Sequence, residues 1–213
     1  MKQCNANKTI TVLGIDLAKQ SFQLHGVDVQ GETVLRKTLN RDKLVAFIAN
    51  LSPCLIGLEA CGGSHHWVRV FTRMGHTVRM MAPQFVKPYV KSNKNDAVDA
   101  ETICEAVGRP SMRFVPVKSI DQQDIQSIHR IRSQLVARRT AQANQIRGLL
   151  MEYGLVLPKG RSHVRKGIPD ILEDAENSLT SLFRELLNDI YKEMIHIDEQ
   201  IQALEQKQAS HDP

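Results

Sequence analysis

Three short segments with the composition of β-strands open the chain, and helical and strand-like segments alternate after them. The first segment is a β-rich apolar run, and a turn at Gly31 separates the second from the third. This order predicts an α/β domain in which helices cover a sheet. The expected strands cover residues 9–16, 21–27, 33–39, 54–59 and 76–82, and the expected helices cover residues 41–51, 64–74 and 95–107.

A different pattern occupies the second half of the chain. Residues 120–153 contain no proline and a single glycine, and their apolar residues recur at helical spacing, which predicts one long helix. A break with proline and glycine at residues 155–167 precedes a second helical stretch over residues 171–207. Two long helices joined by a loop predict a coiled-coil hairpin or arm that pairs with another copy. We therefore expect one domain over residues 1–118 and a helical coiled-coil region over residues 119–213.

The composition is that of a folded protein of a reducing compartment. Apolar residues make up 42% of the 213 residues, which is enough for a packed core. No stretch approaches the roughly 20 apolar residues that span a bilayer, and the polar N-terminus lacks the apolar centre of a signal peptide. The four cysteines include no CxxC pair, and Cys61 with His65 and His66 has no second ligand pair of the kind structural zinc needs. These features favour a cytoplasmic protein.

Positive charge is concentrated before residue 160. Up to Lys159 the chain has 22 lysines and arginines against 12 acidic residues, and from Gly160 onward it has 6 against 11. A basic body predicts a polyanionic partner, with a solvated surface of mixed charge as the simpler alternative. The candidates for nucleic-acid binding are Lys87, Lys91, Lys94, Arg130, Arg138, Arg139 and Arg147.

Four acidic residues lie where apolar elements end or begin. Asp16 ends the first expected strand and Glu59 ends the fourth, and these strands are parallel neighbours in an RNase H/RuvC-like mixed sheet with flanking helices. Asp96 and Asp99 lie three residues apart near a helix start, so they share one face. Clustered carboxylates repel one another unless cations neutralise them, and hard oxygen ligands select Mg²⁺ or Mn²⁺. The pattern predicts a site for two such ions around a phosphodiester.

Each acidic residue also has a simpler interpretation when it is taken alone. Asp16 suits a turn, and Glu59 suits a solvated strand end. Asp96 and Asp99 are favourable charges at a helix N-terminus. Only the combination of all four favours a metal site.

Three blocks of the sequence carry a resemblance to a family of DNA-rearranging proteins. These blocks are GIDLAKQSFQLHGVD, LEACGG and APQFVKPYVKSNKNDAVDAETICEA. In order and spacing they resemble the N-terminal DEDD domain of the insertion sequence 110 family of transposases, which includes the Piv-like DNA invertases. The resemblance covers roughly residues 9–155. It places the catalytic and metal-binding tetrad of the family on Asp16, Glu59, Asp96 and Asp99.

The resemblance implies an RNase H/RuvC-like fold, Mg²⁺ or Mn²⁺ as cofactor, and DNA recombination as the activity. We expect Asp16 on the central strand to bridge two ions, with Glu59 and Asp99 completing their shells and Asp96 assisting. In the family a C-terminal domain supplies a serine nucleophile. No serine of this chain lies in such a context, so we expect that domain to be absent and catalysis by this chain alone to be incomplete.

The resemblance also implies partners and a location. DNA is the expected partner, and a structured guide RNA is a further candidate because at least some members use one. The helical region predicts a homodimer or tetramer, and no membrane association is expected. The expected location is the bacterial cytosol, in association with the nucleoid.

Other functions remain open at this stage. The chain suits a non-catalytic module that binds nucleic acid and dimerises, and it suits a nuclease that resembles a Holliday-junction resolvase. A nucleotide hydrolase of the actin-like class is disfavoured because the opening GIDLAKQ lacks the expected Gly/Thr-rich phosphate turn.

Overall fold

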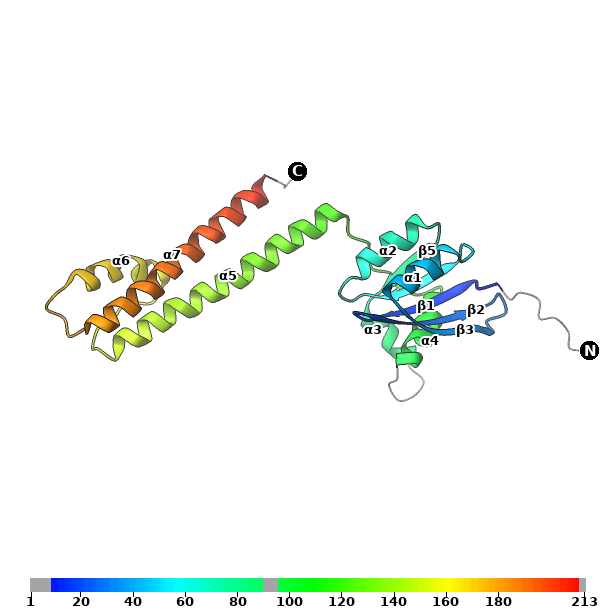
Figure 1. Ribbon diagram of the computed structural model, residues 1–213, viewed down its shortest axis with the longest axis horizontal. Coiled ribbons are helices and arrows are strands. Elements are labelled where there is room, and N and C mark those ends of the chain that lie inside the picture. Colours follow the sequence, from blue (N-terminus) through cyan, green and yellow to red (C-terminus); the bar gives the residue numbers. More distant parts are fainter. Residues whose placement is uncertain (1–8, 90–95, 211–213) are drawn as a thin grey trace, which may run out of the picture. The chain divides into compact units, whose positions relative to one another are not determined.

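The chain divides into two compact units, Met1–Lys118 and Ser119–Pro213. The computed structural model describes residues 9–89 and 96–210, without the side chains of residues 96–98. The first unit contains the sheet, and the second consists of helices (Figure 1).

A mixed five-stranded sheet lies at the centre of the first unit, with the order β3-β2-β1-β4-β5. The neighbours β1/β2 and β2/β3 are antiparallel, whereas β1/β4 and β4/β5 are parallel. The prediction that the first and fourth strands are parallel neighbours is therefore confirmed. The strands are β1 (Val12–Leu17), β2 (Ser21–Val27), β3 (Thr33–Asn40), β4 (Leu55–Glu59) and β5 (Thr77–Met81).

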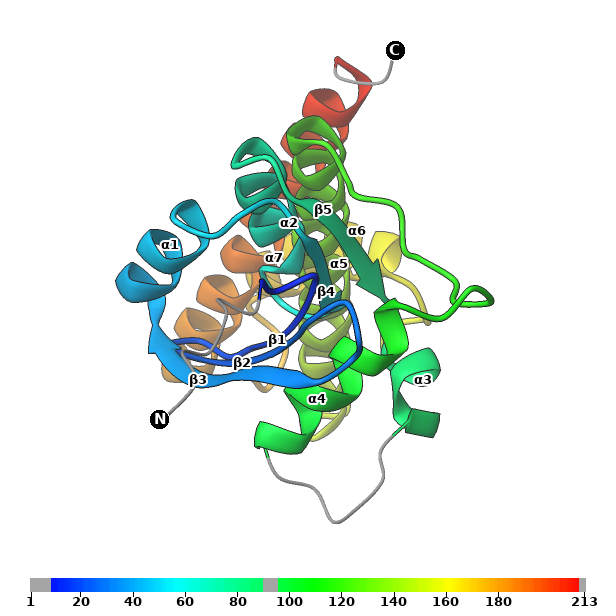
Figure 2. The same cartoon turned by 90° about the vertical axis from the view of Figure 1, so that its right-hand side faces the viewer.

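Helices cover both faces of this sheet (Figure 2). Because side chains alternate along a strand, Leu13 and Ile15 of β1 face one side and Val12 faces the other. Leu13 and Ile15 are fully buried in a core with residues of α1 and α2, whereas Val12 packs against residues of α4. The helices are α1 (Arg41–Ala49), α2 (Ser64–Arg73), the short α3 (Pro83–Val86), the 3₁₀ helix η1 (Lys87–Tyr89) and α4 (Asp96–Val107).

The second unit has a core of its own. Its helices are α5 (Ile120–Met151), α6 (Arg161–Glu173) and α7 (Ser181–Ala209). The long helices α5 and α7 run in opposite directions side by side (Figure 1), and Ile146 of α5 and Leu187 of α7 are fully buried in their shared core. Within the described residues, none of the helices combines the length and the apolar character that crossing a membrane requires.

The start of α6 differs from the prediction. Residues 155–167 were expected to form a break, but α6 begins at Arg161 and continues through Pro169. A proline inside a helix leaves the carbonyl four residues earlier without its usual N–H donor. Here that carbonyl belongs to Arg165, and the hydroxyl of Tyr191 on α7 donates to it at 3.0 Å. The helical stretch expected over residues 171–207, continuous or interrupted, is interrupted: its first residues belong to α6, which ends at Glu173, and α7 begins at Ser181.

Candidate active site

Asp16 and Glu59 lie at the same end of two neighbouring parallel strands. In the β1–β4 register Ile15 is opposite Leu58, so the next residue of each strand is acidic. Both acidic residues are half-buried. The structure therefore brings together the two strand-end carboxylates that the sequence predicted, and repulsion between them favours a cation at this edge.

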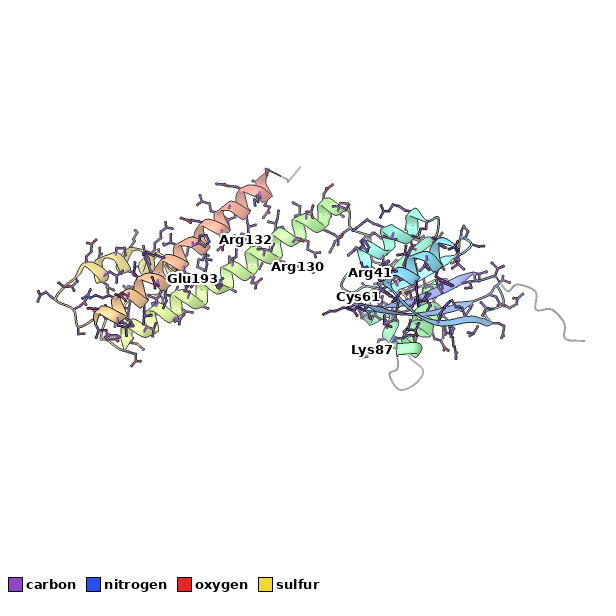
Figure 3. The ribbon with its side chains drawn as sticks, in the orientation of Figure 1. Arg41, Cys61, Lys87, Arg130, Arg132 and Glu193 are labelled. Atoms are coloured by element: carbon purple, nitrogen blue, oxygen red, sulfur yellow. The ribbon has the colours of Figure 1, made fainter. Side chains whose placement is uncertain are left out.

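Cys61 lies two residues beyond β4, and the pKa of its thiol depends on both carboxylates. Although much of this residue is exposed, shielding of its sulfur is the largest cause that raises the pKa of the thiol. The negative charges of Asp16 and Glu59 raise the pKa of Cys61 further. Its Sγ also lies 4.0 Å from the carbonyl oxygen of Leu17, the last residue of β1. The thiol thus marks the edge where the two strands end (Figure 3).

Sequence reasoning had considered Cys61 only as a member of a zinc site, which it disfavoured, and so missed this position. The signal that could have located it is its place directly after a strand that ends in Glu59.

Two glycines bring α4 unusually close to these strands. Gly14 and Gly57 are opposite each other in the β1–β4 register. A Cβ atom on Gly14 would lie 2.2 Å from the carbonyl oxygen of Ala100, and one on Gly57 would lie 2.7 Å from the Cβ of Val107. Residues larger than glycine would therefore push α4 away from the sheet.

The same glycines define the face on which the carboxylates lie. Residues two apart in a strand share one face, so Asp16 follows Gly14 and Glu59 follows Gly57 on the side that α4 covers. The two strands carry this spacing as GID and GLE. This repeated Gly-X-acid pattern is a second signal that sequence reasoning missed.

The two remaining predicted acids belong to the first turn of α4. Asp96 is the first residue of α4, and its side chain lies outside the described residues. Asp99 is half-buried and directly precedes Ala100, the residue that packs against Gly14. Among the side chains that the structure describes, no group of three or more His, Cys, Asp or Glu residues lies close enough to hold a metal ion. The structure thus pairs two of the four acids, and the complete tetrad stays a prediction.

Glu101 fixes the N-terminal half of α4 across the sheet. Its Oε2 accepts a hydrogen bond from Nη2 of Arg36 on β3 at 3.1 Å and lies 3.9 Å from Nδ1 of His25 on β2. Burial lowers the pKa of His25, and the nearby Glu101 carboxylate opposes this shift. These contacts orient the helix that carries Asp99, and no spacing in the sequence indicated them.

His65, on α2, has a position that suits packing, whereas its neighbour His66 is exposed. The backbone N–H of Lys118 donates to Nδ1 of His65 at 3.2 Å, and Arg69 donates to the carbonyl oxygen of Lys118 at 2.8 Å. Burial is the largest cause that lowers the pKa of both His65 and His66. Together these bonds hold the end of the first unit against α2.

Of the predicted nucleic-acid-binding residues, Lys87 and Arg130 are exposed (Figure 3). Lys87 belongs to η1, shortly before the acids of α4. Arg130 helps to line a shallow groove on α5. Lys91 and Lys94 lie outside the described residues.

The other three arginines predicted to bind nucleic acid also lie on α5 and make contacts within the second unit. Arg138 forms an ion pair with Glu193, and Arg139 forms one with Asp198 at 2.7 Å. Arg147 donates to the carbonyl oxygen of Leu157 at 3.3 Å. These contacts give the three residues structural roles, and binding of nucleic acid by them stays a prediction.

Three curated proteins are similar to nearly the whole chain. A "Probable family 20 transposase" of Pseudomonas aeruginosa is 48% identical over 200 residues, which are 93% of this chain and 59% of that protein. The transposase for insertion sequence element IS1111A of Coxiella burnetii is 43% identical over 97% of this chain and 57% of that protein. The transposase for insertion sequence element IS1328 of Yersinia enterocolitica is 39% identical over 95% and 60%, respectively. This chain therefore spans less than two thirds of the length of these relatives.

Two further comparisons concern the family and the fold. A solved structure of T. thermophilus RuvC in complex with Holliday junction substrate superposes with a TM-score of 0.41 at 13% identity, covering 50% of this chain and 99% of that one. The family assignment does not depend on this likeness. Residues 13–155 match the DEDD transposase family of insertion sequence 110, and this match includes both strand-end acids and α4. The chain therefore belongs to that family of transposases.

Proposed function

We propose that this chain forms the metal-binding part of a DNA transposase with an RNase H/RuvC-like catalytic domain over residues 1–118. The observation that carries the proposal is the pairing of Asp16 with Glu59 at neighbouring strand ends, on the face that α4 covers. Asp99 and Asp96 on the first turn of α4 are the natural residues to complete the site. Membership of a transposase family makes DNA phosphodiesters the expected substrate.

The donor set fits a hard divalent cation. The carboxylates of Asp16 and Glu59 offer oxygen ligands, which Mg²⁺ and Mn²⁺ prefer. Bound ions of this kind would neutralise the carboxylates and polarise the scissile phosphodiester. Asp16 and Glu59 would hold the ions, Asp99 and Asp96 would complete the shells, and Glu101 would hold α4 in place through Arg36.

DNA binding is an integral part of the proposal. The exposed Lys87 and Arg130 would contact phosphates, and a structured guide RNA would be a further polyanionic partner. The antiparallel α5 and α7 would supply a coiled-coil arm for a homodimer or tetramer. Strand exchange would also need the part of the relatives that this chain does not match. DNA binding would place the protein at the nucleoid.

A second candidate is a module that binds nucleic acid and dimerises without catalysis. It is favoured by the positive charge that is concentrated before residue 160 and by the exposed side chains of Lys87 and Arg130. A nuclease that resembles a Holliday-junction resolvase would use the same carboxylates and differs from the first proposal only in substrate.

The effect of Mn²⁺ on DNA binding separates the two candidates. If the carboxylates form a metal site, Mn²⁺ will strengthen the binding of a labelled DNA duplex, because unneutralised carboxylates repel phosphate. Glu59→Gln should remove this Mn²⁺ effect, whereas Asp42→Asn, on an exposed residue of α1, should keep it. An identical response of all three proteins to Mn²⁺ would favour the non-catalytic module.

A further inference from the structure

A cavity of about 470 Å³ lies between the three helices of the second unit. Its lining comes from α5, the first turns of α6, and α7, and it carries four guanidinium groups and two carboxylates. The lining charge is therefore positive by two, although two of its three helices, α6 and α7, belong to the acidic part of the chain from Gly160 onward. The charged lining residues are Arg132, Arg139, Arg161, Arg165, Asp198 and Glu205.

Asp198 is the centre of this arrangement. Its carboxylate lies 2.7 Å from Arg139, 3.1 Å from Arg161 and 3.6 Å from Arg165. A single carboxylate neutralises one of these three cations, so the cluster has a surplus of positive charge. The side chains of Asp198 and Arg139 are only 12% and 14% exposed, which makes their pair part of the packed interior.

The other two arginines present their guanidinium groups to solvent. The side chains of Arg161 and Arg165 are 59% and 58% exposed. A guanidinium has five N–H donors in a planar fork, and contact with one carboxylate leaves donors for a second anion. Asp198 therefore positions the two guanidinium groups and leaves N–H donors on each of them to bind a second anion.

The start of α6 adds backbone donors at the same cavity. Arg161 and Ser162 are the first residues of this 13-residue helix, and Gly160 before them provides no side-chain cap. The first N–H groups of a helix have no partner within the helix, and together with the helix dipole they favour an anion. Ser162 lines the cavity as well, so its hydroxyl is a further donor.

We propose that this cavity binds a backbone phosphate of a nucleic acid, with Arg161 and Arg165 as its principal ligands. The tetrahedral phosphate offers several oxygen acceptors to guanidinium forks and backbone N–H groups that approach from different directions. That the phosphate belongs to a nucleic acid rests on the proposed function. The site itself is in the second unit and involves none of the acids of the candidate active site.

Binding of a labelled DNA duplex and a labelled RNA hairpin, measured by fluorescence anisotropy over a KCl series with EDTA present, tests the proposal. Arg161→Ala/Arg165→Ala should weaken binding of at least one probe by about tenfold. It should also reduce the slope of log affinity against log salt by about 1. The matched control is Lys166→Ala/Lys192→Ala, which removes two exposed charges from α6 and α7 outside the cavity and should have a smaller effect.

Equal losses in the two double variants, or an unchanged salt slope, would overturn the proposal. The single variants Arg161→Gln and Arg165→Gln each keep two of the three ion pairs to Asp198, so they test the site if the double variant does not fold. Each should weaken binding severalfold, and normal binding by both would also overturn the proposal. Isothermal titration calorimetry with inorganic phosphate distinguishes a site for nucleic-acid phosphate from a site for free phosphate. Phosphate binding that the double variant loses, with unchanged nucleic-acid affinity, would indicate a site for free phosphate instead.

EDTA makes this result independent of the carboxylate site. Suppose that Glu59→Gln leaves the Mn²⁺ effect on DNA binding unchanged, while Arg161→Ala/Arg165→Ala weakens nucleic-acid binding as expected. That result would refute the catalytic proposal alone. The opposite pattern would refute the phosphate site alone.

Discussion

At the scale of single residues, the candidate site depends on two carboxylates that the sequence predicted and on neighbours that it did not. Asp16 and Glu59 could be predicted because an acid at the end of an apolar strand is costly without a partner. Cys61 was missed as their neighbour, although its place two residues after Glu59 was a signal that could have located it. The contact between Glu101 and Arg36 links residues 65 positions apart, and no local pattern encodes it.

The reactivity of Cys61 reports directly on the two carboxylates. Their negative charge raises the pKa of its thiol, so removing one charge should lower that pKa and increase the thiolate fraction at pH 8. We expect Asp16→Asn and Glu59→Gln each to accelerate alkylation of Cys61 severalfold, measured by mass spectrometry of the labelled peptide. Asp42→Asn should leave the rate unchanged. Unchanged rates in all three variants would show that the carboxylates do not act on this thiol.

At the scale of elements, the order of strands and helices was largely predictable, and α6 was not. Alternating and apolar segments predicted the five strands, because burial imposes these patterns locally. The parallel pairing of β1 with β4 was expected from the RNase H-like fold and not from a local pattern. The break was predicted over residues 155–167 because Pro158, Gly160 and Gly167 disfavour helices in isolation. The hydroxyl that compensates for Pro169 belongs to Tyr191 of a different helix, so only tertiary structure reveals it.

A double-mutant cycle tests this compensation. Tyr191→Phe removes the donor to the carbonyl of Arg165 and should lower the free energy of unfolding by about 1 kcal/mol. In a Pro169→Ala background the restored backbone N–H can satisfy that carbonyl, so the same change should cost less. Urea unfolding of the four proteins measures both values. A loss of equal size in the two backgrounds would mean that Tyr191 does not compensate for the proline.

The docking of α4 on the sheet makes a separate prediction. A Cβ on Gly14 would lie 2.2 Å from the oxygen of Ala100 and 2.4 Å from the backbone nitrogen of Cys104, and backbone atoms of a packed helix cannot yield easily. Gly14→Ala should therefore lower the free energy of unfolding by about 1–3 kcal/mol. Gly62→Ala, where a Cβ meets no atom within 4 Å, is the control and should be close to neutral. Equal stability of the two variants in urea would argue against this close packing.

At the scale of the whole molecule, two units with separate cores offer two different kinds of chemistry. The first unit presents carboxylates suited to a divalent cation, and the second presents guanidinium groups suited to phosphate. The charge distribution of the sequence predicted a polyanionic partner. It did not predict the positive cavity, because the arginines of this cavity come from both the basic and the acidic parts of the chain and meet only when α5, α6 and α7 pack together.

Binding of Mn²⁺ tests the central claim, that the strand-end acids form a metal site. The measurement is isothermal titration calorimetry of the chain and of Asp16→Ala, each with a DNA duplex present so that substrate can help to assemble the site. Asp42→Ala is the control for loss of an acidic residue. The chain and the control should bind Mn²⁺ with the same affinity, and Asp16→Ala should lose this binding. Equal Mn²⁺ binding by all three proteins, or none by any of them, would contradict the claim.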